Sequence, residues 1–220
     1  MRRRFYGYSR DQRAEKAALA DSVVLANRDN LVGALALEDL AYVDTEHFLS
    51  LYGEVSGQVQ EFYLVKSAWE SIQVQNRTAP GQPFTDYLVP GGNPDGTDVH
   101  LSDYVGRGRY ILLDHWASWC GPCKAEMPNV VAAYKKYHDK GFDIVGVSFD
   151  KEKDPWVKAI TEWEMPWIHL SDLQYWGNAA SDLYHVNSIP DNLLIDPDGT
   201  VVARGLRGKQ LEEKLAGIFE

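Results

Sequence analysis

Two cysteines, Cys120 and Cys123, stand between an apolar run and a helix-forming stretch, and they are the only cysteines in the 220-residue chain. The run covers residues 110–117 and is apolar enough to be a central strand that is buried on both faces. The stretch after Cys123 favours a helix up to about residue 140. Alternating strands and helices continue to the end of the chain, which predicts an α/β domain built around this junction.

The position of each cysteine suggests a separate chemical role. If Gly121 opens the helix, Cys120 lies at the helix N-terminus, where unpaired N–H groups and the helix dipole favour a thiolate. Cys120 is then the attacking sulfur, and Cys123, one turn later on the same face, is the resolving sulfur. A loop this short restrains the unfolded chain little. A disulfide here would therefore stabilise the fold only weakly and is better suited to thiol-disulfide exchange.

Other uses of the cysteine pair are weaker. A structural zinc site needs four ligands, yet there is no further cysteine, and the six histidines contain no pair three to five residues apart. An inert short-range disulfide, or two unreactive thiols, stays open as an alternative. We therefore expect no metal and no bound cofactor beyond the redox-active disulfide Cys120–Cys123.

Two segments resemble a known family. Residues 112–124 read LLDHWASWCGPCK, with Pro128 five residues after Cys123, and resemble the active-site segment of thioredoxin-fold proteins. Ser188-Ile189-Pro190 before the apolar residues 193–195 resembles the cis-proline loop of that family. Within the thioredoxin superfamily, residues 79–220 most resemble the TlpA/ResA-like thiol-disulfide oxidoreductases of the bacterial envelope, because of residues 82–84, 100–104 and 124–128.

The resemblance implies a thioredoxin-like fold, a central mixed β-sheet flanked by helices, and a thiol-disulfide oxidoreductase that acts on protein substrates. Gly-Pro between the cysteines resembles the reducing members, so we expect a reductase of protein disulfides. It would be supplied by an upstream redox donor such as a membrane thiol carrier or thioredoxin. A disulfide donor or isomerase, a thiol peroxidase and a non-enzymatic interaction module are the alternatives, although the peroxidase motif Pro-x-x-x-Thr-x-x-Cys is absent around Cys120.

Asp114, six residues before Cys120, matches the buried carboxylate that the family places beneath its active site. Burial should raise its pKa and suit it to accept the proton of Cys123, directly or through water. The alternative is a surface aspartate without a catalytic role.

Five residues are expected to contact the substrate. Pro190 would form a cis peptide that leaves the backbone of Ile189 open, so that an extended substrate segment can pair with it; the alternative is an ordinary trans proline. Gly121 and Pro122 lie between the sulfurs in sequence. Trp119 would form an apolar rim beside the nucleophile.

Three further residues are candidates for tuning the thiols. Glu126 matches a glutamate of the TlpA/ResA group and is either a tuner of thiol acidity or a solvated helix residue. His115 is either a satisfied core histidine or a proton-relay partner of Asp114. Asp191 follows the cis-proline position, where a carboxylate near the sulfurs would raise the Cys120 pKa and disfavour acidic substrates. Gly146 stands where thioredoxin carries a lysine, so Asp114 should titrate differently here.

Residues 1–78 show helical periodicity, and residues 79–220 form the redox domain. Apolar residues 62, 65, 69 and 72 recur three and four apart, and Asp44 and Ser56 are plausible N-caps. Proline and glycine between residues 76 and 83 end this pattern. The helical segment resembles the N-terminal region of some TlpA-like proteins of Bacteroides-type bacteria, and its aromatic residues are expected to be core.

Charge and hydropathy restrict partners and location. The formal net charge of −10 disfavours a nucleic-acid surface and would steer in substrate proteins with a basic face. Arg2, Arg3 and Arg4 resemble the start of a signal peptide, but no apolar segment follows, and no run reaches the roughly 18 apolar residues of a membrane span. We expect a soluble chain that acts in the periplasm or cell envelope after loss of its export signal, with the cytoplasm as the alternative.

Overall fold

The computed structural model describes residues 10–220, with side chains from residue 18 onward. The arginines of the signal-like start therefore lie outside the described residues. The chain forms two compact units, Met1–Gln73 and Val74–Glu220. Thr78 lies in the second unit, where it is buried and its hydroxyl accepts a hydrogen bond from Arg204 (3.1 Å). The division at residue 78 remains a prediction.

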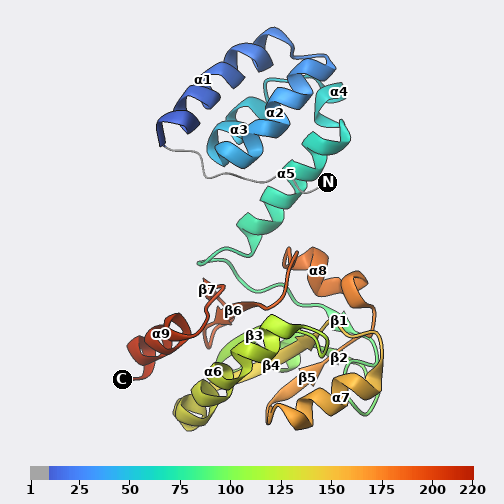
Figure 1. Ribbon diagram of the computed structural model, residues 1–220, viewed down its shortest axis with the longest axis vertical. Helices are drawn as coiled ribbons and strands as arrows, with labels where there is room; N and C mark the ends of the chain where they lie inside the picture. The colour runs from blue at the N-terminus through green and yellow to red at the C-terminus, as the bar shows by residue number, and fades with distance from the viewer. Residues whose placement is uncertain (1–9) are drawn as a thin grey trace. The chain divides into compact units, whose positions relative to one another are not determined.

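The first unit is helical, as the periodicity predicts (Figure 1). Asp44 and Ser56 are N-caps, because their side chains accept backbone N–H bonds from His47 and Val59. Aliphatic and aromatic side chains of all five helices form one core, which includes Leu37. The helices are α1 (Arg10–Ala26), α2 (Leu31–Val43), α3 (Thr45–Tyr52), α4 (Gly57–Gln60) and α5 (Tyr63–Arg77).

The second unit contains a five-stranded mixed sheet in the order β5-β4-β3-β6-β7. Strand β3 is parallel to β4 and antiparallel to β6, and β4 is parallel to β5. Both central strands are almost fully buried, as apolar strands covered on both faces should be. The strands are β3 (Tyr110–Trp116), β4 (Phe142–Ser148), β5 (Ile168–Leu170), β6 (Asp191–Ile195) and β7 (Val201–Arg204).

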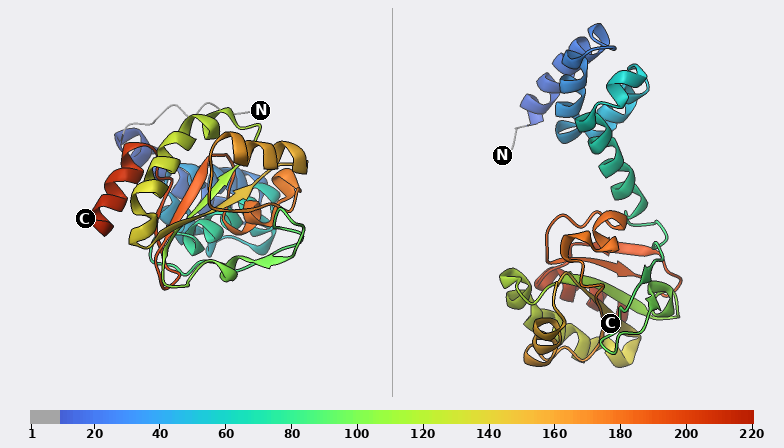
Figure 2. Two further views of the ribbon diagram at one scale, coloured as in Figure 1. Left: turned by 90° about the horizontal axis from the view of Figure 1, so that it is seen from below. Right: turned by 90° about the vertical axis from the view of Figure 1, so that its right-hand side faces the viewer.

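Helices flank this sheet, which confirms the predicted thioredoxin-like fold (Figure 2). Strand β3 lies within the predicted run 110–117, and α6 begins at Gly121 as predicted but ends before residue 140. Helix α6 stops at Tyr137, and a 3₁₀ turn follows it. This turn ends at Gly141, which has a positive φ of 106°. The helices are α6 (Gly121–Tyr137), α7 (Lys153–Glu162), α8 (Ala179–Leu183) and α9 (Lys209–Phe219).

The small hairpin that precedes the sheet is shorter than predicted. Its strands are β1 (Leu88–Val89) and β2 (Val99–His100), whereas the sequence predicts strands over 84–89 and 97–101. The carboxylate of Asp86 accepts bonds from the backbone N–H and the hydroxyl of Ser102. These bonds hold residues 101–103 in a 3₁₀ turn, so the second strand ends early.

Sheet topology brings two distant loops together. The cysteine loop follows β3, and the proline loop precedes β6. Because β6 runs antiparallel to β3, with His115 opposite Asp191, the residue before β6 lies beside the residues that follow β3. The sheet thus places Pro190 next to the cysteines.

Candidate active site

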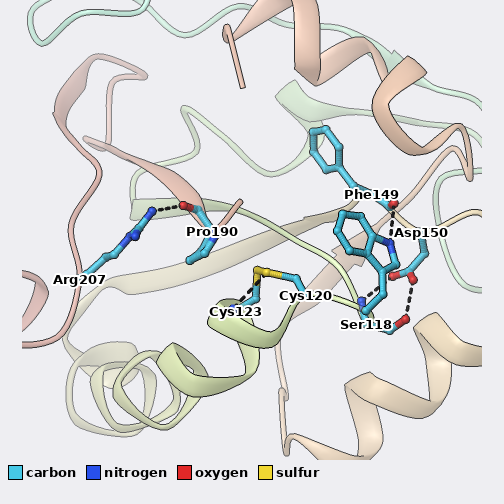
Figure 3. Close-up of a disulfide and its surroundings, with 8 residues drawn as sticks. Ser118, Cys120, Cys123, Phe149, Asp150, Pro190 and Arg207 are labelled. Atoms are coloured by element: carbon cyan, nitrogen blue, oxygen red, sulfur yellow. Dashed lines mark hydrogen bonds between the residues drawn. A yellow bond between two sulfur atoms is a disulfide. The ribbon is translucent and has the colours of Figure 1, made fainter. Parts of the chain in front are cut away.

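Cys120 and Cys123 form a disulfide at the start of α6, with a Cα–Cα distance of 5.2 Å (Figure 3). Cys120 is the N-cap, and its sulfur accepts a bond from the backbone N–H of Cys123 at 3.1 Å. Both cysteines are buried, whereas Gly121 and Pro122 between them are exposed. The backbone at Gly121 and Pro122 is therefore the part of the pair that a partner protein meets first.

Pro190 faces the disulfide, and its peptide bond with Ile189 is cis, as expected (Figure 3). Pro190 is buried and Ile189 is half-buried. The Pro190 carbonyl accepts a hydrogen bond from the guanidinium of Arg207, which comes from the loop before α9. Arg207 was not predictable from the sequence, because nothing in the local pattern links it to a proline 17 residues earlier.

Asp114 is buried on β3, with 3% of its surface exposed. Burial raises its pKa to about 7, and the negative charges of Glu126 and Asp191 act in the same direction, while Arg207 lowers it. A carboxyl group with this pKa can hold or release a proton near neutral pH. The structure thus places a carboxyl group that can exchange a proton near neutral pH on the strand that leads to Cys120.

Glu126 connects α6 to the loop before α9. Its carboxylate accepts bonds from the backbone N–H of Gly208 (2.6 Å) and from the side chain of Asn129 (3.1 Å). It is half-buried, and its charge contributes to the raised pKa of Asp114. Glu126 is thus a structural bridge as well as an electrostatic neighbour of Asp114, and a role in thiol acidity stays a prediction.

His115 lies in the core of the second unit. Its ring is fully buried, and neither ring nitrogen makes a well-formed hydrogen bond to a described residue, although the backbone of Asp191 acts on the ring. It packs against Phe149 and Tyr184, and adjacent strand residues point to opposite faces, so it cannot relay a proton directly to Asp114. Burial lowers its pKa to about 4, which keeps the ring neutral near pH 7.

Asp191 forms an ion pair with Arg204, at 2.5 Å between the carboxylate and the guanidinium. Its second oxygen accepts the backbone N–H of Asn192. The sequence predicts a carboxylate near the sulfurs at this position. In the structure a cation balances this charge, because Arg204 of β7 reaches across from the neighbouring strand.

The glycine at position 146 leaves room for two rings. A Cβ there would lie 2.8 Å from Nδ1 of His169 and 3.0 Å from Nε1 of Trp116. A lysine therefore does not fit at this position, and Arg207 is the cation that acts on Asp114 instead. Burial also lowers the pKa of His169 to about 4.

The loop before Cys120 is held by Asp150, which lies just after β4 and is not among the site residues predicted from the sequence. Its buried carboxylate accepts the backbone N–H of Ser118 (2.9 Å) and the Ser118 hydroxyl (2.5 Å) (Figure 3). It also accepts the Ser148 hydroxyl (2.7 Å). An acidic residue directly after an apolar strand was the available signal, since polar residues at strand ends often serve a site. Asp150 fixes where the cysteine loop leaves the sheet.

Trp119, directly before Cys120, is 47% exposed. Its indole N–H donates to the carbonyl of Phe149 at 3.2 Å. Trp116, in contrast, is buried beneath the site.

The described residues contain neither a metal-binding group nor a membrane-spanning helix. No three His, Cys, Asp or Glu side chains within residues 18–220 come together in a way that could hold a metal ion. None of the helices in the described part of the chain has the length and apolar character needed to cross a membrane.

Comparisons with known proteins agree with this geometry. The model of the AhpC/TSA family matches residues 80–204. The thiol-disulfide oxidoreductase ResA of Bacillus cereus is 30% identical over 151 residues, which is 69% of this chain and 79% of the relative. Among solved structures, the thioredoxin domain of a Bacteroides vulgatus thiol-disulfide oxidoreductase covers 64% of this chain and 99% of its own, at 30% identity and a TM-score of 0.58. A thiol:disulfide interchange protein from Bacteroides sp. is 31% identical with a TM-score of 0.56, and the match covers 64% of this chain and 90% of the other.

Proposed function

This chain belongs to the AhpC/TSA family and is a thiol-disulfide oxidoreductase of the thioredoxin fold, and from this premise we propose that it reduces disulfides in protein substrates. The observation that carries the proposal is the Cys120–Cys123 disulfide at the N-terminus of α6, beside Pro190. Exposed backbone at Gly121 and Pro122 gives a partner protein access to the pair.

In the first step, the Cys120 thiolate of the reduced enzyme attacks one sulfur of the substrate disulfide. A bond forms between Cys120 and that sulfur, the substrate S–S bond breaks, and the departing thiolate takes a proton from solvent. The helix N-terminus stabilises the attacking thiolate, and the backbone N–H of Cys123 already points at the Cys120 sulfur. These groups favour the thiolate form of Cys120.

In the second step, Cys123 resolves the mixed disulfide. Its thiol transfers a proton to the Asp114 carboxylate, and the resulting thiolate attacks the Cys120 sulfur. The Cys120–Cys123 disulfide forms, and the second substrate sulfur leaves as a thiolate, which is then protonated. Two electrons have passed from the enzyme thiols to the substrate, so an external dithiol must reduce the enzyme again. We propose a membrane thiol carrier or a thioredoxin in that role.

We propose that substrate chains bind in extended form along the backbone of Ile189. The cis peptide and the half-buried position of Ile189, two residues before β6, support this, because an added strand can pair there. Trp119, Gly121 and Pro122 would contact the same segment from the other side of the sulfurs. We also propose that the protein acts in the periplasm or cell envelope. Cell fractionation tests this proposal, because the native gene product should then be recovered outside the cytoplasm.

The direct test is the reduction potential of the pair together with trapping of the mixed disulfide. A potential near about −270 mV supports a reductase, whereas a value near about −120 mV would make the protein a disulfide donor instead. Cys123→Ser should accumulate a mixed disulfide at Cys120, visible by mass spectrometry, and Cys120→Ser should form none. If the pair does not cycle reversibly, the reductase proposal is wrong and a non-enzymatic binding role takes its place.

A further inference from the structure

Trp119 is the one exposed residue among the Phe, Tyr and Trp residues of the unit Val74–Glu220, all of whose residues the structure describes. It stands directly before Cys120, so any substrate cysteine that reaches the sulfur brings its neighbouring residues close to this ring. The indole N–H bond to the Phe149 carbonyl fixes one edge of the ring. An exposed indole next to a nucleophile is thus held in place before a substrate arrives.

A second segment, residues 171–178, supports the same ring. Tyr175 lies with its ring centroid 5.1 Å from that of Trp119, and Trp176 lies at 6.4 Å. The ammonium of Lys151 lies over the Tyr175 ring, 4.6 Å from its centroid, which is within the range of a cation–π interaction. Tyr175 thus contacts both a cation and the indole of Trp119.

The backbone of this segment adopts an unfavourable conformation. Leu173 and Tyr175 have positive φ values of 57° and 58°, which residues with a Cβ rarely adopt. Side chains hold the segment there: the Ser171 hydroxyl accepts the N–H of Leu173, and the Asp172 carboxylate accepts the N–H of Gln174 and the side-chain amide of Asn178. Backbone strain that persists under such restraint is often found where a side chain must be presented in one orientation.

We propose that residues 171–178 form a specificity element of the enzyme, in which Tyr175 fixes Trp119 as the wall of a subsite for an aromatic or large apolar side chain adjacent to the target cysteine of a substrate. This inference rests on the proposed reductase function and deepens it. Trp119 contacts the substrate, and Tyr175 and Lys151 are positioning residues that act through it.

The indole of Trp119 determines which substrate side chains fit this subsite. The exposed indole face offers offset or edge-on contacts to a second ring and a broad apolar surface to leucine or methionine. Because Trp119 is already ordered, little side-chain entropy is lost when the substrate binds. The ammonium of Lys151 beside the wall disfavours a basic side chain at the same position.

The test uses two symmetric disulfide-linked peptides, Gly-Phe-Cys-Gly and Gly-Ser-Cys-Gly, and their counterparts with Phe or Ser after the cysteine. The pre-reduced full-length enzyme is mixed with each, and kcat/KM for peptide reduction is measured. We expect kcat/KM to be about five- to tenfold higher for the Phe peptide than for the Ser peptide, with the residue placed either before or after the cysteine. Tyr175→Ser and Tyr175→Gly should lower this ratio below about twofold, and Tyr175→Phe should retain it. Glycine tolerates the positive φ, so its variant tests the side chain without added backbone strain.

The matched control is Tyr63→Ser, which removes a 76% exposed tyrosine from α5 in the first unit and should leave the ratio unchanged. If the wild-type enzyme reduces the Phe and Ser peptides equally in both orders, the reductase function stands and the subsite is disproved. If Tyr175→Ser keeps the wild-type ratio, the positioning role of Tyr175 is disproved. If none of the peptides nor 2-hydroxyethyl disulfide is reduced, the proposed function itself fails, and the subsite with it.

Discussion

At the scale of single residues, burial decides the protonation of Asp114. Its pKa is about 7 in the folded protein and about 3.9 in an unfolded chain. Between these values the folded state keeps a proton that the unfolded state has released. The contribution of Asp114 to stability is therefore complete below about pH 4 and is lost as the pH rises through about 7.

Replacing Asp114 with Asn should remove this loss. We expect Asp114→Asn to raise the free energy of unfolding at pH 8 by roughly 2–4 kcal/mol, since each pKa unit corresponds to about 1.36 kcal/mol. The same variant should slow resolution of the mixed disulfide, because Cys123 loses its proton acceptor. Urea titrations between pH 4 and 8 measure the first effect. Asp182→Asn, at an exposed position of α8, is the control and should behave as wild type.

His115 has the opposite pH dependence. Its pKa is about 4 when folded and about 6.5 when unfolded, so the unfolded state takes up a proton first as the pH falls. Its contribution to stability is present above about pH 6.5 and is lost as the pH falls through about 4. His115→Leu also removes two ring nitrogens that make no well-formed hydrogen bond to a described residue. At pH 5 we expect the free energy of unfolding of this variant, measured by urea titration, to exceed that of wild type by about 1–2 kcal/mol. At pH 7.5 the difference should be smaller. Equal or lower stability at pH 5 would contradict this account.

At the scale of elements, Asp150 joins the end of β4 to the loop that leads into α6. Asp150→Ala removes the acceptor of three hydrogen bonds and leaves the Ser118 N–H without its carboxylate. We expect a loss of about 2–4 kcal/mol in the free energy of unfolding, together with slower peptide reduction, because the position of Cys120 relaxes. Asp139→Ala, at an exposed position after α6, should change neither quantity.

The contact between β4 and β5 depends on the glycine at position 146. In Gly146→Ala the new methyl group would meet the buried rings of His169 and Trp116 at 2.8–3.0 Å. We expect a destabilisation of about 1–3 kcal/mol in thermal or urea unfolding, since a packed core gives way only with strain. His169→Ala should relieve part of it, so that the double variant is more stable than the sum of the single effects predicts. Simple additivity would show that the ring is not the obstacle.

At the scale of the whole molecule, each unit has a hydrophobic core of its own. We therefore expect residues 74–220 alone to unfold cooperatively and to reduce 2-hydroxyethyl disulfide at a rate within about twofold of the full chain. A fragment that begins at residue 79 lacks Thr78, the hydrogen-bond partner of Arg204, and should be less stable by about 1 kcal/mol. Equal stability of the two fragments would favour a boundary at residue 78.

Much of this protein was predictable from its sequence, because the signals are local. The strand before Cys120, the helix after it, the caps Asp44 and Ser56, and a buried Asp114 all follow from apolar periodicity, turn chemistry and nearest neighbours. The cysteine pair and the proline loop then suffice for a family resemblance, which the comparisons confirm.

Only the tertiary structure placed the residues that surround the sulfurs from elsewhere in the chain. Arg207 reaches the Pro190 carbonyl, Asp150 holds Ser118, and Tyr175 supports Trp119, each across at least 17 residues of chain. It also showed that the nitrogens of His115 make no well-formed hydrogen bond to a described residue and that Arg204 balances Asp191. Local sequence determines which element each residue enters. Pairing between strands and packing between elements decide which side chains meet, and these depend on the free energy of the whole fold.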